Sequence, residues 1–146
     1  MDIKSGETYP SNALSNFAPH PFMIDGVNCN SMEGFLQSLK FKSSEMQEYV
    51  CTLVGYKAKM KGKNKNWWRT QKLYWKGKEI DRHSQEYQDL LDRAFKQLSK
   101  NTKFAAALKA TNNSNITHSI GKSDPNRTIL TVSEFCNRLI NLRNNL

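Results

Sequence analysis

Three side chains of different chemistry recur at helical spacing in the segment "SMEGFLQSLKF": Glu33, Gln37 and Lys40. Positions i, i+4 and i+7 share one face of a helix, and this face adjoins an apolar stripe, so we expect the three side chains to line a cleft. The carboxylate could stabilise a positive, oxocarbenium-like centre or act as a general acid or base. A lysine with a lowered pKa could attack the anomeric carbon of a sugar.

The two charged residues of this trio also have an ordinary structural explanation. With Asn30 as the N-cap, Glu33 would occupy the third helical position and close a capping box. Lys40, near the end of the same helix, would interact favourably with the helix macrodipole. The spacing alone does not separate the two explanations, so a catalytic role for Glu33 and Lys40 needs support from elsewhere in the chain.

A second candidate is the basic segment "YKAKMKGKNKNWWRTQK", which runs from Tyr56 to Lys72. Basic residues interleaved with aromatic side chains are what phosphate contact combined with base stacking requires. The alternative is a solvated lysine-rich loop whose tryptophans pack into the core. The candidate nucleic-acid-binding residues are Lys57, Lys59, Lys61, Lys63, Lys65 and Arg69, and the candidate ligand-binding aromatics are Trp67 and Trp68.

A third candidate is the loop "THSIGKSDPNRT", which contains His118, Asp124 and Arg127. Polar residues in such loops carry function more often than core residues do, although Asp-Pro and Asn are also turn formers in their own right. The chain has no P-loop, dinucleotide-binding glycine motif, nucleophile elbow or HExxH motif. No set of metal ligands is visible either, so we expect neither a metal nor a cofactor.

Composition and charge restrict the partners. The chain has 146 residues, a net charge of +9 and a pI of about 9.6, and such a basic protein attracts phosphates. Its three cysteines are an odd number without a CxxC pair, which predicts reduced thiols rather than disulfides or a zinc site. No apolar run approaches a membrane span and the N-terminus lacks a signal-peptide core, so we expect a cytoplasmic protein, monomeric or a small oligomer.

Periodicity predicts a mainly α fold with a few short strands, an α+β class, in a single domain over residues 1–146. The segment 62–83 is expected to be a long, tryptophan-rich connection. In the second predicted helix, Tyr49 is expected to face inward. The predicted elements are a hairpin over 21–29 turning at Asp25-Gly26, helices over 32–42, 44–54, 84–99, 102–110 and 132–142, and a short helical piece around 57–61.

The sequence resembles the NADAR family, the NAD- and ADP-ribose-associated superfamily that includes YbiA-like N-glycosidases. The family shows S-N-F, then a D-G turn, then an S-x-E-h-x-x-Q-x-x-K-F helix. This chain has Ser15-Asn16-Phe17, Asp25-Gly26, and then Ser31, Glu33, Gln37 and Lys40-Phe41 in the same order. Many members also carry a D-x-x-W-G segment before the last helix. Here Asp124 is the candidate for that aspartate and the tryptophan is missing, as in a divergent subgroup similar to phage and bacterial versions.

The resemblance implies an N-glycosidase, a hydrolase that cleaves a bond between a ribose and a nitrogenous group. One implied activity removes ADP-ribose from guanine in DNA, which reverses a DarT-type toxin and protects a phage or host genome against such defence. The other hydrolyses phosphoribosyl-amino-pyrimidine intermediates of riboflavin synthesis, and a non-catalytic ADP-ribose or nucleic-acid binding module is a third possibility. By the resemblance, Glu33 and Lys40 are catalytic, and Ser15, Asn16, Phe17 and Gln37 shape the ribose and pyrophosphate pocket.

Overall fold

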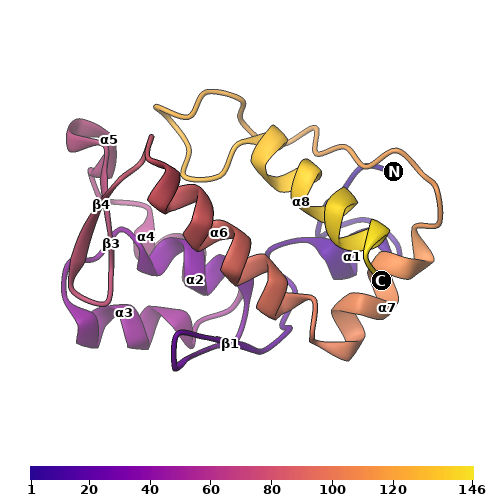
Figure 1. Ribbon diagram of the computed structural model, residues 1–146, viewed down its shortest axis with the longest axis horizontal. Coiled ribbons are helices and arrows are strands. Elements are labelled where there is room, and N and C mark those ends of the chain that lie inside the picture. Colours follow the sequence, from indigo (N-terminus) through magenta and orange to yellow (C-terminus); the bar gives the residue numbers. More distant parts are fainter.

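The computed structural model describes residues 1–146 as eight helices and two separate antiparallel hairpins, which confirms the predicted, mainly helical α+β class (Figure 1). No helix combines the length and the apolar character that a membrane span requires. The elements are α1 (Ser11–Leu14), β1 (Phe22–Ile24), β2 (Val27–Cys29), α2 (Met32–Ser38), α3 (Ser44–Cys51), α4 (Gly55–Gly62), α5 (Trp67–Thr70), β3 (Lys72–Trp75), β4 (Lys78–Asp81), α6 (Gln85–Leu98), α7 (Thr102–Ala110) and α8 (Val132–Asn144).

Helix α2 lies at the centre and packs against both α3 and α4. Its N-cap is Ser31, whose hydroxyl accepts a hydrogen bond from the backbone of Gly34 and donates one to the carbonyl of Leu53. A Cβ at Gly34 would lie 2.5 Å from that same carbonyl oxygen, so only glycine allows the two helices to approach this closely. The start of α2 is therefore fixed against the end of α3.

Helix α2 is shorter than the predicted range 32–42. It ends at Ser38 with Leu39 as C-cap, so Lys40 lies just beyond the helix rather than on it. Because Ser31 and not Asn30 is the N-cap, Glu33 does not occupy the capping-box position. The structural explanation considered for Glu33 therefore does not hold.

The first hairpin has the predicted turn, with positive φ at both Asp25 and Gly26. The second hairpin corrects the prediction of a long connection over 62–83. This segment instead contains the end of α4, helix α5 and the strand pair β3–β4, with its turn at Lys76 and Gly77, both again at positive φ. Lys-Gly is a weaker turn signal than Asp-Gly, and four-residue strands give too little alternation to detect.

The three C-terminal helices match their predicted ranges closely. Helix α6 buries one face against β1, β4 and α8, while α7 packs against α1 and α8 (Figure 1). A capping box at the start of α8 pairs Thr131 with Glu134, the T-x-x-E spacing typical of a helix start. The prediction for Tyr49 was wrong, because its side chain is 53% exposed on α3, where Gln47 and Val50 are buried instead. The three cysteines are free and buried.

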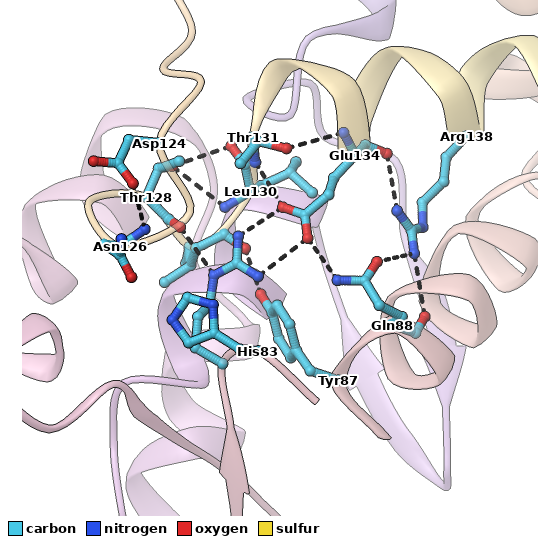
Figure 2. A network of polar contacts seen from close by, with 12 residues as sticks. His83, Tyr87, Gln88, Asp124, Asn126, Thr128, Leu130, Thr131, Glu134 and Arg138 are labelled. Atoms are coloured by element: carbon cyan, nitrogen blue, oxygen red, sulfur yellow. Dashed lines mark hydrogen bonds and ion pairs between the residues drawn. The ribbon is translucent and has the colours of Figure 1, made fainter. Parts of the chain in front are cut away.

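A buried polar network joins the end of β4 to the segment that leads into α8 (Figure 2). The guanidinium of Arg82, whose side chain is 1% exposed, pairs with Glu134 through two hydrogen bonds of 3.1 and 2.7 Å. The Nε of Arg82 donates to the carbonyl of Thr128 at 3.0 Å. The side chain of Arg82 thus donates hydrogen bonds both to the carboxylate that caps α8 and to the backbone of the preceding loop.

Helix α6 supplies two further contacts of this network (Figure 2). The hydroxyl of Tyr87 donates to the carbonyl of Ile129, and the amide of Gln88 donates to Glu134 at 2.6 Å. Burial pushes the pKa of Glu134 upward, but the hydrogen bonds from Arg82, the Thr131 backbone and Gln88 outweigh it, so the pKa lies below its usual value. The irregular segment 128–131 is therefore held in place by side chains.

We expect Arg82→Met to lower the melting temperature by about 10 °C or more. Removing one partner of a buried pair leaves a buried, unpaired charge, at a cost of about 3–5 kcal/mol. Thermal unfolding followed by circular dichroism measures this, with Arg93→Met as the control. Arg93 pairs with Asp25 at 2.9 Å but is half exposed, so its loss should change little. The double variant Arg82→Met/Glu134→Gln should recover part of the loss. Similar melting temperatures for Arg82→Met and Arg93→Met would contradict this account.

Candidate active site

A cavity of about 500 Å³ opens between α2, the loop after α1 and the irregular segment 118–130. On the α2 side, the cavity wall is held in place by a backbone hydrogen bond: the N–H of Glu33 donates to the carbonyl of Asn16 at 3.0 Å. This bond holds the S-N-F segment against the first turn of the helix. The sequence-predicted residues that line the cavity are Ser15, Asn16, Phe17, Glu33, Gln37, Lys40, Lys59, Trp67, His118 and Arg127.

Other predicted residues lie outside this cavity. Trp68 is exposed on α5. Asp124 is exposed, and its carboxylate accepts a hydrogen bond from the backbone of Asn126, as a turn-forming aspartate does. Arg69 lies over the ring of Trp68. Lys57, Lys61, Lys63 and Lys65 are all exposed and do not line the cavity.

The lysine run does not form one stripe. Alternate positions on α4 are separated by about 200° around the helix axis, which distributes their side chains over different faces. Lys59 points to the cavity, whereas the ammonium of Lys61 lies 5.7 Å from the ring centre of Tyr49. The ammonium of Lys65 lies 4.7 Å from the ring centre of Phe41. The run is therefore a broad positive surface with one member at the cavity.

Glu33 is the one carboxylate of the cavity lining. Burial raises its pKa above the usual value. The hydrogen bond that Gln37 donates at 2.7 Å, and the positive charges of Lys40 and Lys59, oppose this rise without cancelling it. The carboxyl group thus keeps its proton to a higher pH than an exposed glutamate does.

Lys40 changes in the opposite direction. Burial lowers its pKa, and the nearby Lys122 adds to the effect, while the charge of Glu33 opposes it. A buried amine of this kind is present in its neutral, nucleophilic form more often than an exposed lysine. The acid and the amine therefore both shift toward the states that proton donation and nucleophilic attack require.

Gln37 is held by Gly62 on α4. Its Nε2 donates a hydrogen bond to the carboxylate of Glu33, while its Oε1 is buried and has no hydrogen-bond partner. A Cβ at Gly62 would lie 1.9 Å from that oxygen, so glycine is required for Gln37 to occupy this position. The side-chain oxygen of Gln37 is therefore enclosed against α4, while its amide nitrogen faces Glu33.

The loop before α8 supplies lining residues that the sequence reasoning missed, namely Lys122, Thr128, Ile129 and Leu130. The cavity lining therefore contains four basic residues and a single carboxylate. The basic residues are Lys40, Lys59, Lys122 and Arg127. This excess of positive charge favours an anionic ligand such as a pyrophosphate. A single lysine in an irregular loop produces no periodic signal, and the loop was a candidate only because of its other polar residues, His118, Asp124 and Arg127.

His118 closes one end of the cavity. Its Nδ1 lies 2.8 Å from the carbonyl oxygen of Ile3, and its ring meets Phe135 edge-on with the ring centres 5.0 Å apart. A Cβ at Gly121 would lie 2.6 Å from the imidazole, so the loop folds tightly over the histidine. These contacts make His118 a fixed part of the wall, with its Nδ1 occupied by the backbone.

Comparisons with known proteins relate this geometry to phage and bacterial proteins. A family model described as bacteriophage protein GP30.3 matches residues 8–144. An uncharacterized 17.1 kDa protein from the Gp30-rIII intergenic region of Enterobacteria phage T4 is 36% identical over 151 residues, covering all of this chain and 98% of that protein. The NMR structure of E. coli YbiA superposes with a TM-score of 0.60 at 16% identity, over 98% of this chain and 81% of that one, and therefore shares the fold.

We expect Glu33→Gln to raise the melting temperature at pH 7.5. Because the folded state holds the Glu33 proton more tightly than the unfolded chain, the free energy of unfolding falls as the pH rises from about the unfolded pKa through the folded one. Glutamine removes that penalty while its carbonyl still accepts from Gln37. At pH 4 the melting temperature of the variant should equal that of the wild type. Thermal unfolding at both pH values measures this, with the exposed Glu79→Gln as control, and a lower melting temperature at pH 7.5 would indicate a structural role.

Proposed function

The chain belongs to the bacteriophage GP30.3 family and has the fold of YbiA, and we propose that it is an N-glycosidase that removes ADP-ribose from guanine bases in DNA. One observation carries the proposal: a partly buried acid, Glu33, and a partly buried amine, Lys40, line the same cavity, whose other charged residues are cations. ADP-ribose matches this arrangement, because it presents an anomeric carbon to the acid and amine and a pyrophosphate to the cations.

In the proposed reaction, the neutral amine of Lys40 attacks the anomeric carbon while the bond to the guanine nitrogen breaks. The protonated carboxyl of Glu33 gives its proton to that nitrogen, so the base leaves neutral, and the carboxylate then takes a proton from the newly bound amine. Expulsion of the ring oxygen, protonated by Glu33, produces a Schiff base. Water adds to it, which releases ADP-ribose and restores the amine. The lowered pKa of Lys40 and the raised pKa of Glu33 favour the starting states.

The net charge of +9 favours a DNA-linked substrate over a phosphoribosyl-amino-pyrimidine intermediate. A polyanionic strand offers phosphates to the exposed lysines of α4 as well as to the cavity, whereas a small intermediate reaches the cavity alone. The position of Asp124 favours a different candidate, a non-catalytic ADP-ribose binding module. Asp124 was the candidate for the family aspartate, and it lies outside the cavity in a surface turn.

Release of free ADP-ribose from DNA that carries ADP-ribose on guanine tests the activity. Wild-type protein should release it, and Glu33→Gln and Lys40→Ala should each lower the rate about 100-fold or more, because each removes a group that acts in the transition state. Lys109→Ala, an exposed lysine of α7 outside both the cavity and the basic segment, is the matched control and should stay within about twofold. If the wild type binds ADP-ribose but releases none, the binding-module function replaces this one.

Borohydride trapping tests the covalent step separately. Reduction during turnover should attach the ribose irreversibly to Lys40, so that peptide mass spectrometry finds the added mass on the peptide that contains it. Lys40→Ala should give no adduct, and omission of borohydride should give none with the wild type. An active wild-type enzyme that yields no adduct would mean that Lys40 binds the ligand or stabilises charge without becoming covalently attached.

A further inference from the structure

A second hollow, of about 490 Å³, lies beside the candidate active site. It is lined by Trp68, Gln71, Lys122, Asn126 and Arg127. Two of these residues, Lys122 and Arg127, also line the main cavity, so the two depressions meet at a pair of cations. A ligand that fills the main cavity can therefore continue into the hollow past these two positive charges.

The wall of the hollow is an exposed tryptophan. Trp68 is 53% exposed, whereas the neighbouring Trp67 is buried at 8% and lines the main cavity. The guanidinium of Arg69 lies 5.3 Å from the ring centre of Trp68 and makes a cation–π contact with that ring. The remaining exposed surface of the ring is available for another flat group.

The hollow is built from fixed parts. Gln71 ends α5 in a left-handed conformation, with φ of 58°, and its Nε2 donates to the carbonyls of Trp68 and Asn126 at 2.8 and 2.9 Å. Its Oε1 lies 3.0 Å from Nε2 of His83. The turn that carries Asn126 and Arg127 is closed by Asp124 through two further bonds to their backbone N–H groups. Gln71 thus fastens the floor of the hollow to the helix that bears Trp68.

We propose that this hollow binds the nucleotide next to the modified one in single-stranded DNA. Its base stacks on Trp68, and the phosphate that links it to the modified nucleotide lies between Lys122 and Arg127. This subsite rests on the proposed function and extends it, because it makes the substrate a strand rather than a small molecule. Stacking of bases on aromatic rings beside cations is a sequence-tolerant way to hold such a strand.

Charge distribution favours a strand over the adenine of ADP-ribose as the occupant. Lys63 and Lys65 are exposed in the connection that leads into α5, and Arg69 follows Trp68. These three basic residues lie outside the lining of both depressions, and Arg69 is in direct contact with Trp68. A strand supplies a phosphate at each nucleotide to meet these charges, whereas ADP-ribose has only its pyrophosphate.

Fluorescence anisotropy with an unmodified, fluorescein-labelled oligo-dT of roughly ten nucleotides tests the subsite. Trp68→Ala should weaken binding about tenfold, and Trp68→Phe, which keeps a stacking ring, should restore most of the affinity. Tyr56→Ala removes another exposed aromatic side chain, on α4, that lines neither depression, and should change binding less than twofold. Lys122→Ala should weaken binding and reduce the slope of log affinity against log salt by about one.

Isothermal titration with free ADP-ribose forms the second arm of the experiment. Trp68→Ala should leave this affinity unchanged. A loss of affinity for ADP-ribose would place the adenine on Trp68 and overturn the proposal, as would oligo-dT binding within twofold of the wild type. Because both readouts are equilibrium binding, they do not depend on cleavage. A protein that releases no ADP-ribose but loses oligo-dT affinity on Trp68→Ala would contradict the glycosidase function and still support the subsite.

Discussion

The buried ion pair between Arg82 and Glu134 is the constraint on which one whole wall of the cavity depends. The segment that contributes Thr128 and Ile129 belongs to no helix or strand, so its buried carbonyls need partners from side chains. Arg82 and Tyr87 supply them, and the same Arg82 neutralises the carboxylate that caps α8. A charge removed from water is costly unless it is fully hydrogen-bonded, and here each oxygen of Glu134 accepts at least two bonds.

The opposite wall is held by backbone contact instead. Gly34 and Ser31 set α2 against the carbonyls at the end of α3, and the backbone of Glu33 fixes Asn16. Lys40 lies past the end of the helix, where the carbonyl of the preceding Leu39 accepts from the backbone of Tyr74 on β3 at 2.8 Å. The acid therefore depends on helix packing and the amine on the second hairpin. These two side chains of the cavity are thus positioned by elements far apart in the sequence.

This division explains what the sequence could and could not predict. Helix caps are local, so Ser84, Asn101 and Thr131 mark the starts of α6, α7 and α8 correctly. The early end of α2 is a tertiary effect, because the backbone of Leu39 leaves the helix to bond with β3, a strand too short to show in the hydrophobic pattern. Glu33 and Lys40 emerged from helical spacing and from the family resemblance, although only Glu33 is helical.

Residues outside periodic elements were harder to place. Trp67 and Trp68 are adjacent and identical in type, yet one is buried at the cavity and the other exposed at the second hollow, because successive residues of a helical turn face different directions. Lys122 and Ile129 join the site only through the contacts that hold the loop before α8. Side-chain contacts between α6 and that loop carry no sequence periodicity.

The absence of a direct ion pair between Glu33 and Lys40 bears on how the site can work. A salt bridge would hold both groups in their charged forms, which would remove the proton from the acid and the lone pair from the amine. Instead the carboxylate is engaged by the neutral amide of Gln37, and burial shifts the two pKa values toward each other. Holding two ionisable groups partly buried without a mutual ion pair lowers the stability of the fold. Apolar side chains at these positions would not carry that cost, so packing alone does not explain the acid and the amine.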